Sequence, residues 1–146
     1  MPRFSLETAL KVRERLEKLY QKALAEQIQI EKQHRDIISV MKNALETHNS
    51  DIDFAKKNTL TINQLLMSTN FQKRISSNLE SKNQQLNEHL EIVALKRKEL
   101  TKATQKKRIF EILKEKEVKK IKQYEERLDR LEADEIAQNY KRFKQN

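Results

Sequence analysis

The chain has 146 residues with a net charge of +9; 36% of the residues are charged and 36% hydrophobic, with no Gly, one Pro and no Cys. This composition is typical of long helices, and it excludes a disulfide framework, thiolate chemistry and a Gly-rich phosphate loop. The sequence has no apolar run long enough to span a membrane, and its start lacks the apolar region of a signal peptide. We therefore expect a cytoplasmic protein without a transmembrane segment.

The positive charge is concentrated in one band of the sequence. Residues 91–123 carry 12 Lys and Arg against 5 Asp and Glu, whereas residues 124–146 carry 5 against 6. Such a band is compatible with a solvated helix face, with a face that attracts an acidic protein, or with a helix that contacts phosphates. It lacks the Asn and Arg pattern of a leucine-zipper basic region, so we expect no nucleic-acid partner.

A first helix is expected over about 5–57, with Ser5 as its N-cap. Its seam alternates steps of four and three residues, which is the heptad pattern of a coiled coil. The seam positions are Ala9, Arg13, Leu16, Tyr20, Ala23, Gln27, Ile30, His34, Ile37, Met41, Ala44 and His48. Poor helix formers at 47–53 predict a bend or fraying there, and residues 68–70 are a similar weak segment.

Several signals agree on a turn at about 58–61. Lysines at 56–57 suit a helix C-terminus, where they meet the negative end of the helix dipole. Asn58 suits the left-handed conformation that closes many helices. Thr61 and Gln64 have the spacing of a capping box, which predicts that a second helix begins there.

The second helix is expected over about 61–141. If the chain folds back at this turn, residues whose numbers sum to about 119 face one another. This rule pairs Leu6 with Leu113, Ala9 with Phe110, Tyr20 with Leu100, Ile30 with Leu90, Met41 with Leu79, Leu45 with Ile75, and Ile52 with Met67. The predicted fold is therefore a single all-α domain, an antiparallel two-helix coiled-coil hairpin with a longer second helix.

The two predicted helices differ in length, and this difference indicates a binding function. At about 1.5 Å per residue the first helix is roughly 80 Å long and the second roughly 120 Å. Beyond about Lys114 the second helix has no partner, yet apolar positions continue at Ile121, Tyr124, Leu128, Leu131 and Ile136. An isolated helix with an exposed apolar stripe is only marginally stable and tends to associate, so we expect it to bind a partner. A homo-oligomeric structural coiled coil, in which this stripe self-associates, is the alternative.

The histidines and the charged residues do not form a catalytic pattern. His34, His48 and His89 are scattered, and no two of them have the spacing of helical metal ligands. Glu and Lys alternate as they do on solvated helix faces. A long pair of helices also lacks the concave pocket that substrates need. We therefore expect no enzyme, no cofactor and no metal site.

Short motifs stand at both ends of the chain. The first consists of Phe4, Ser5, Leu6, Glu7, Leu10 and Arg13, and the last of Leu131, Asp134, Glu135, Ile136, Ala137 and a trailing Phe143. Both motifs resemble those of the FliJ family of flagellar type III export proteins, and Phe71, Ile75 and Leu79 are similar to that family's segment just after the turn. The resemblance covers the whole length, and injectisome stalk proteins look alike at this level.

The resemblance implies a non-catalytic hairpin similar to the stalk subunit of rotary ATPases. Its helical ends are expected to enter the hexameric export ATPase (FliI), and the protein is expected to link that ring to the export gate (FlhA) and to export chaperones at the cytoplasmic face of the inner membrane. The expected ATPase contacts are Phe4, Leu6, Leu10, Arg13, Leu128, Leu131, Asp134, Glu135, Ile136 and Ala137. The expected export-gate contacts are Phe71, Ile75 and Leu79.

Overall fold

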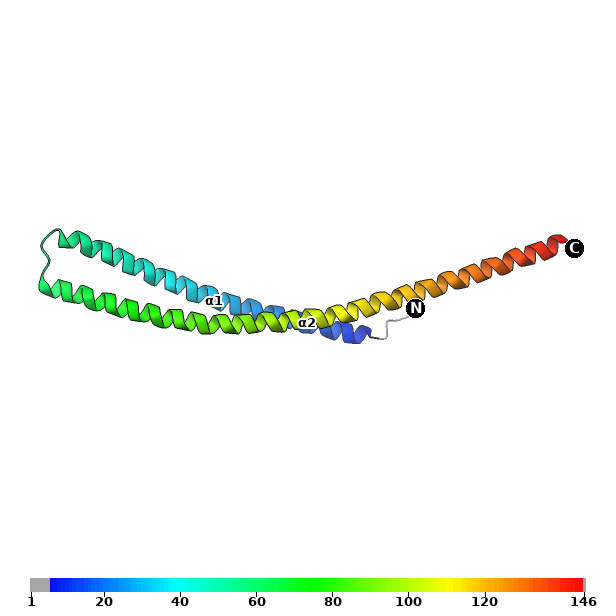
Figure 1. The fold of residues 1–146 in the computed structure, drawn as a ribbon, viewed down its shortest axis with the longest axis horizontal. Helices are drawn as coiled ribbons and strands as arrows, with labels where there is room; N and C mark the ends of the chain where they lie inside the picture. Colours follow the sequence, from blue (N-terminus) through cyan, green and yellow to red (C-terminus); the bar gives the residue numbers. More distant parts are fainter. Residues whose placement is uncertain (1–5, 146) are drawn as a thin grey trace. The chain divides into compact units, whose positions relative to one another are not determined.

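The computed structural model describes residues 6–145, which form two helices and no strand. The first helix, α1 (Glu7–Lys56), has 50 residues, and the second, α2 (Ile62–Gln145), has 84. They pack against one another as an all-α antiparallel hairpin with a longer second helix, as predicted (Figure 1). Phe4 and the expected N-cap Ser5 lie outside the described residues.

Contacts divide the hairpin into two compact units. The tip unit, residues 20–100, contains the turn together with the parts of α1 and α2 that flank it. The base unit combines residues 6–19 of the first arm with residues 101–145 of the second. Each unit is held together by its own contacts between the two helices.

The last turn of α1 tightens before the chain leaves the helix. The backbone N–H groups of Lys57 and Asn58 donate to the carbonyls of Phe54 and Ala55, at 3.2 and 3.1 Å. These bonds span three residues, as in a 3₁₀ turn. No described non-glycine residue has a positive φ, so the expectation of a left-handed Asn58 was wrong. The tightened turn gives two carbonyls at the end of the helix hydrogen-bond partners, and it avoids the steric cost of a left-handed residue.

The first turn of α2 carries the predicted capping box. The backbone N–H of Gln64 donates to Thr61 Oγ1 at 3.2 Å, and the N–H of Thr61 donates to Gln64 Oε1 at 3.2 Å. This reciprocal pair satisfies two donors that have no partner inside the helix. The prediction is confirmed, and it explains why α2 begins directly after Thr61.

The buried face of α1 in the tip unit keeps the heptad period but differs from the predicted seam at alternate positions. Ile38 is 6% exposed, whereas the predicted Ile37 is 41% exposed, and Leu45 is likewise less exposed than Ala44. The observed seam runs Tyr20, Leu24, Gln27, Glu31, His34, Ile38, Met41, Leu45, His48, Ile52 and Ala55, and the predicted Ala23 is also half-buried beside Leu24. Both phases satisfy the local periodicity, so packing against α2 decides between them.

Contacts across the tip unit place the two arms close to the predicted register. The rings of His48 and Phe71, whose numbers sum to 119, lie 4.4 Å apart between centroids. His89 Nε2 donates to the backbone carbonyl of Gln27 at 2.7 Å, a pair whose numbers sum to 116. One correction concerns Met67, which was expected to face the first arm but is exposed.

Ser68 is buried in place of Met67, and its Oγ lies 2.8 Å from His48 Nε2. Beside this pair, Gln72 Nε2 donates to Asn49 Oδ1 at 2.7 Å. The two segments of poor helix formers, 47–53 and 68–70, therefore lie opposite each other, and both are helical. Polar bonds between the arms compensate there for weak local propensity.

Candidate functional site

In the base unit, α2 continues well beyond the first turn of α1. Lys114 Nζ lies 3.6 Å from Glu7 Oε1, which marks where α1 begins on α2. From Lys122 to Gln145 every residue of α2 is exposed. Figure 1 shows this end of α2 continuing beyond α1. These 24 residues, which we call the overhang, span about 36 Å at 1.5 Å per residue.

The overhang repeats the spacing of the paired seam that precedes it. Glu117 and Ile121 are the last half-buried positions of that seam, and the same alternating steps lead on to Tyr124, Leu128 and Leu131, which are all exposed. We call Ile121, Tyr124, Leu128 and Leu131 the apolar stripe. Side chains at these positions pack against a neighbouring helix in a coiled coil. The stripe is therefore a seam without a second helix among the described residues.

Beyond Leu131 the apolar side chains move to another side of the helix. Ile136 follows after five residues, which is about 140° around the axis at about 100° per residue. Tyr140 and Phe143 continue from Ile136 at helical spacing, and all three are exposed. The overhang therefore presents apolar surface on more than one side, unlike a helix that rests on a flat partner.

The residues predicted to contact an ATPase at the C-terminal end all lie in this overhang. Leu128 and Leu131 belong to the apolar stripe, and residues 134–137 follow as one exposed turn. Asp134, Glu135, Ile136 and Ala137 are consecutive, so they are distributed around the whole circumference of α2. The structure thus keeps all six accessible on one continuous helix.

The corresponding N-terminal residues have different environments. Leu6 is exposed, but Leu10 is buried and belongs to the core of the base unit. The Arg13 guanidinium lies over the ring of Phe110, 5.8 Å from its centroid. Leu10 and Arg13 are thus engaged with the protein itself, so of these three side chains Leu6 is the most accessible to a partner.

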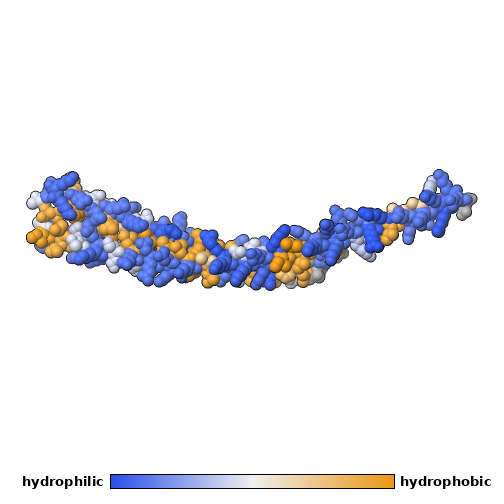
Figure 2. Space-filling view, viewed as in Figure 1, coloured by the Kyte–Doolittle hydropathy of each residue, from blue (hydrophilic) through white to orange (hydrophobic). Residues whose placement is uncertain are grey.

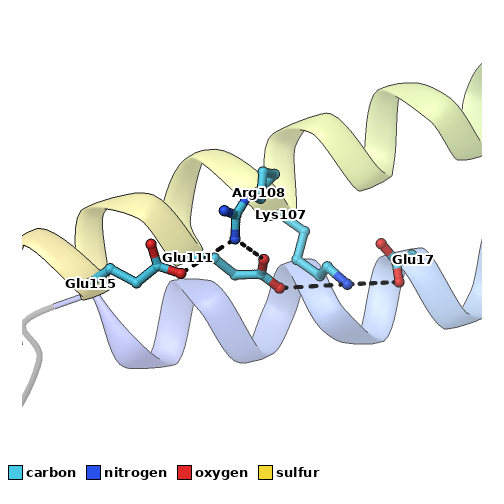
Figure 3. Close-up of polar contacts among 5 residues, drawn as sticks. All are labelled: Glu17, Lys107, Arg108, Glu111 and Glu115. Carbon is cyan, nitrogen blue, oxygen red and sulfur yellow. Dashed lines mark hydrogen bonds and ion pairs between the residues drawn. The ribbon is translucent and has the colours of Figure 1, made fainter.

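Ion pairs cover one flank of the base unit (Figure 3). Lys107 Nζ lies 3.0 Å from Glu17 Oε1 on α1 and 3.6 Å from Glu111 Oε1. Arg108 Nη1 lies between Glu111 and Glu115, at 3.1 and 3.4 Å. The hydrogen bond with Lys107 holds the pKa of Glu17 below its ordinary value, and the same bond raises the pKa of Lys107.

We expect the pair of Glu17 and Lys107 to make the stability of the protein depend on pH. Because the pKa of Glu17 is below its ordinary 4.5, its contribution is present above pH 4.5 and is lost as the pH falls through the folded-state pKa. Because the pKa of Lys107 is above its ordinary 10.5, its contribution is present below pH 10.5 and is lost as the pH rises through the folded-state pKa.

Denaturant unfolding across the acid range measures this effect. Glu17→Gln is expected to flatten the loss of unfolding free energy on acidification, whereas the control Glu115→Gln, on the exposed rim of the ion-pair group, changes it less. Identical acid profiles for the wild type and Glu17→Gln would contradict this prediction.

The predicted export-gate contacts lie in the tip unit, at steps of four along α2. Phe71 is partly exposed beside His48, while Ile75 and Leu79 are half-buried between the arms. Leu79 also lines an open groove together with Ser76, Glu80, Asn83, Gln84 and Asn87. These side chains therefore pack within the hairpin and still reach its surface at one edge.

Sequence reasoning missed an exposed apolar group around the turn. Phe54, Ile62, Leu66 and Met67 are all exposed there, and Figure 2 shows apolar surface at this end of the tip unit. Phe54 and Ile62 fall outside the predicted seams, so their exposure could have been found from spacing, whereas Met67 was expected to face Ile52. Met67 lies one helical turn before Phe71 on α2, so this group extends the apolar surface that a partner of the tip unit can use.

The described residues contain neither a metal-holding group nor a membrane-spanning helix. Among them, no three or more His, Asp or Glu side chains form a group that could hold a metal ion. No helix in the same range is long and apolar enough to cross a bilayer.

The comparison with protein families identifies the chain. The family model described as "Flagellar FliJ protein" matches residues 2–145. No curated protein and no solved structure matches the chain. The family match spans both helices and both ends that carry the sequence motifs. The protein therefore belongs to the FliJ family, a group of non-catalytic proteins related to flagellar export.

Proposed function

We propose that this protein is a non-enzymatic stalk and adaptor of the flagellar type III export apparatus, and that its overhang enters the central pore of the hexameric export ATPase (FliI). The observation that carries this proposal is the overhang itself. It is a continuous helix, exposed over 24 residues, with apolar side chains and no partner among the described residues.

The distribution of side chains favours an enclosing partner. Successive residues of a helix lie about 100° apart, so a flat surface can contact only one or two of residues 134–137 at once. A ring surrounds the helix and can contact all four. A single helix with its side chains is about 10–12 Å wide, which suits a narrow axial pore. Leu6, directly before α1, adds an accessible apolar side chain in the same unit.

The tip unit is proposed to contact the membrane export gate (FlhA). Phe71, Ile75 and Leu79 reach the surface at one edge of α2, and the exposed Met67 lies one turn before Phe71. Export chaperones are proposed as further partners on the strength of family membership. With these partners the protein would work in the cytoplasm, at the periphery of the inner membrane.

Purified components test the central proposal. The protein should be retained by the hexameric ATPase in a pull-down and should stimulate its ATP hydrolysis, because a stalk that orders the ring favours its active assembly. Absence of both binding and stimulation, with a protein that is helical by circular dichroism, would refute the stalk role.

Replacing Phe71 with Ala is expected to weaken binding to the cytoplasmic domain of the gate protein about tenfold or more, since a buried aromatic side chain contributes about 1.5–3 kcal/mol. Titration calorimetry measures the dissociation constant. Phe143→Ala is the matched control, because Phe143 is an exposed Phe outside the tip unit. Unchanged binding of Phe71→Ala would remove Phe71 from the proposed contact.

A further inference from the structure

The two flanks of the seam in the base unit differ in their chemistry. One flank carries the ion pairs, including the carboxylates of Glu7, Glu111 and Glu115. In an antiparallel pair, the other flank brings one row of α1 beside one row of α2. These rows are Ala9, Val12, Leu16 and Leu19 on α1, and Lys102, Lys106, Ile109, Leu113, Lys116 and Lys120 on α2. We call this flank the basic face; it contains no carboxylate.

The basic face combines an apolar centre with unpaired cations. Val12 and Ile109 are 48% and 57% exposed, and Leu19 and Leu113 are also exposed. No hydrogen bond or ion pair joins its four lysines to another described residue. Apolar surface is visible in Figure 2 where the first turns of α1 lie on α2. A surface of this kind suits a helix with an apolar stripe and acidic flanks.

The same chain contains such a helix. Residues 124–137 carry 6 Asp and Glu against 2 Arg, although the protein as a whole is strongly basic. Tyr124, Leu128 and Leu131 provide the apolar stripe of this segment, and all are exposed. The overhang cannot reach the basic face of its own chain, because both belong to one continuous α2. A second copy has no such restriction.

We propose that two copies of the chain form a reciprocal dimer, in which the overhang of each packs as a third helix on the basic face of the other. The exchange is isologous, so it closes on itself and leaves no unpaired overhang. It buries the apolar stripe and sets the acidic segment against the four lysines. If the proposed function is correct, the dimer covers the surface that binds the ATPase, and the two assemblies compete.

Analytical ultracentrifugation of the full chain at low ionic strength tests the dimer. The wild type should sediment as a dimer at about 100 µM, given the modest area of two helix contacts. Val12→Lys with Ile109→Lys, and separately Leu128→Lys with Leu131→Lys, should each raise the dissociation constant at least about a hundredfold by placing charge in apolar contacts. The control Val40→Lys alters a side chain that is 67% exposed in the tip unit, and it should leave the dimer intact.

Mixing the two double variants distinguishes the reciprocal dimer from a dimer in which overhang pairs with overhang. The first retains an intact overhang and the second an intact basic face, so the mixture should form a heterodimer through one contact although neither variant self-associates. Pairing of overhang with overhang predicts no association in the mixture. A monomeric wild type at this concentration, or a mixture that remains monomeric while the wild type dimerises, would overturn the proposal.

The test of the dimer can fail or succeed independently of the test of ATPase binding. Val12→Lys with Ile109→Lys leaves the overhang unaltered, so it should bind the ATPase at least as well as the wild type does while failing to dimerise. Failure of this monomeric variant to bind the ATPase, together with a wild type that dimerises, would refute the stalk role alone. Raising the salt concentration from about 50 to about 500 mM should weaken the dimer about tenfold or more, because the charged groups lie at its rim.

Discussion

A chain that ends after Lys120 is expected to lose its binding to the hexameric export ATPase while its two helices remain paired. The truncation removes Ile121 and the whole overhang, whose residues are exposed and add nothing to the packing of the base unit. Burying each large apolar side chain of the stripe in the ring contributes about 1.5–3 kcal/mol. Loss of four such side chains should weaken binding by more than about a thousandfold.

Retention on an immobilised ATPase ring measures the binding, and circular dichroism measures the remaining helix. In the full chain, Leu128→Ser with Leu131→Ser should reproduce most of the loss, whereas Val118→Ser, an exposed position outside the stripe, should not. If the truncated chain loses helix well beyond the deleted residues, the overhang stabilises the fold. The argument for a docking role would then fail.

The second large effect is expected on stability. Leu86 is buried between the arms of the tip unit, and Leu86→Ala should lower the free energy of unfolding by about 2–3 kcal/mol. This loss of unfolding free energy lies near the low end of the range for a buried Leu, because two helices can partly close the cavity that the substitution leaves. Such a loss is nevertheless a large share of the stability of a small protein.

The matched control is Leu95→Ala, which makes the same chemical change at an exposed position of the same helix. It should cost less than about 1 kcal/mol, as surface substitutions generally do. Urea unfolding followed at 222 nm, with both variants and the wild type, gives the comparison. Equal destabilisation by the two substitutions would mean that the seam of α2 has been assigned to the wrong face.

Polar seam residues are an unusual feature of this thin core, and they help to set its register. His34 and His89 lie side by side in the tip unit, with ring centroids 5.6 Å apart, and His89 bonds the backbone of Gln27. Lys107 occupies a seam position in the base unit and bonds Glu17 across it. Because a displaced register would break such bonds, they select one alignment of two helices that apolar contacts alone would align less strictly.

Local features of the hairpin were predictable because their causes lie within a few residues. Thr61 and Gln64 complete a capping box whichever way the rest of the chain folds. The absence of Gly and the heptad spacing are enough to predict long helices with a single turn. The apolar stripe of the overhang was equally visible, because an unpaired coiled-coil seam has the same spacing as a paired one.

Features that depend on the second helix were not predictable in the same way. Ile37 and Ile38 both fit a heptad, and only packing against α2 selects Ile38. Ser68 is buried instead of Met67 because His48 across the seam provides a hydrogen-bond partner. Asn58 stays out of the left-handed region because the last turn of α1 tightens.

The sequence by itself determined that this protein is two helices joined at one turn and that the second outlasts the first, because helix periodicity, capping and length are local properties of the chain. Only the tertiary structure decided which side chains fill the seam and which flank of the base unit is left basic and apolar. The physical reason is that a helix offers several nearly equivalent faces, and their energies separate only when a second helix covers one of them.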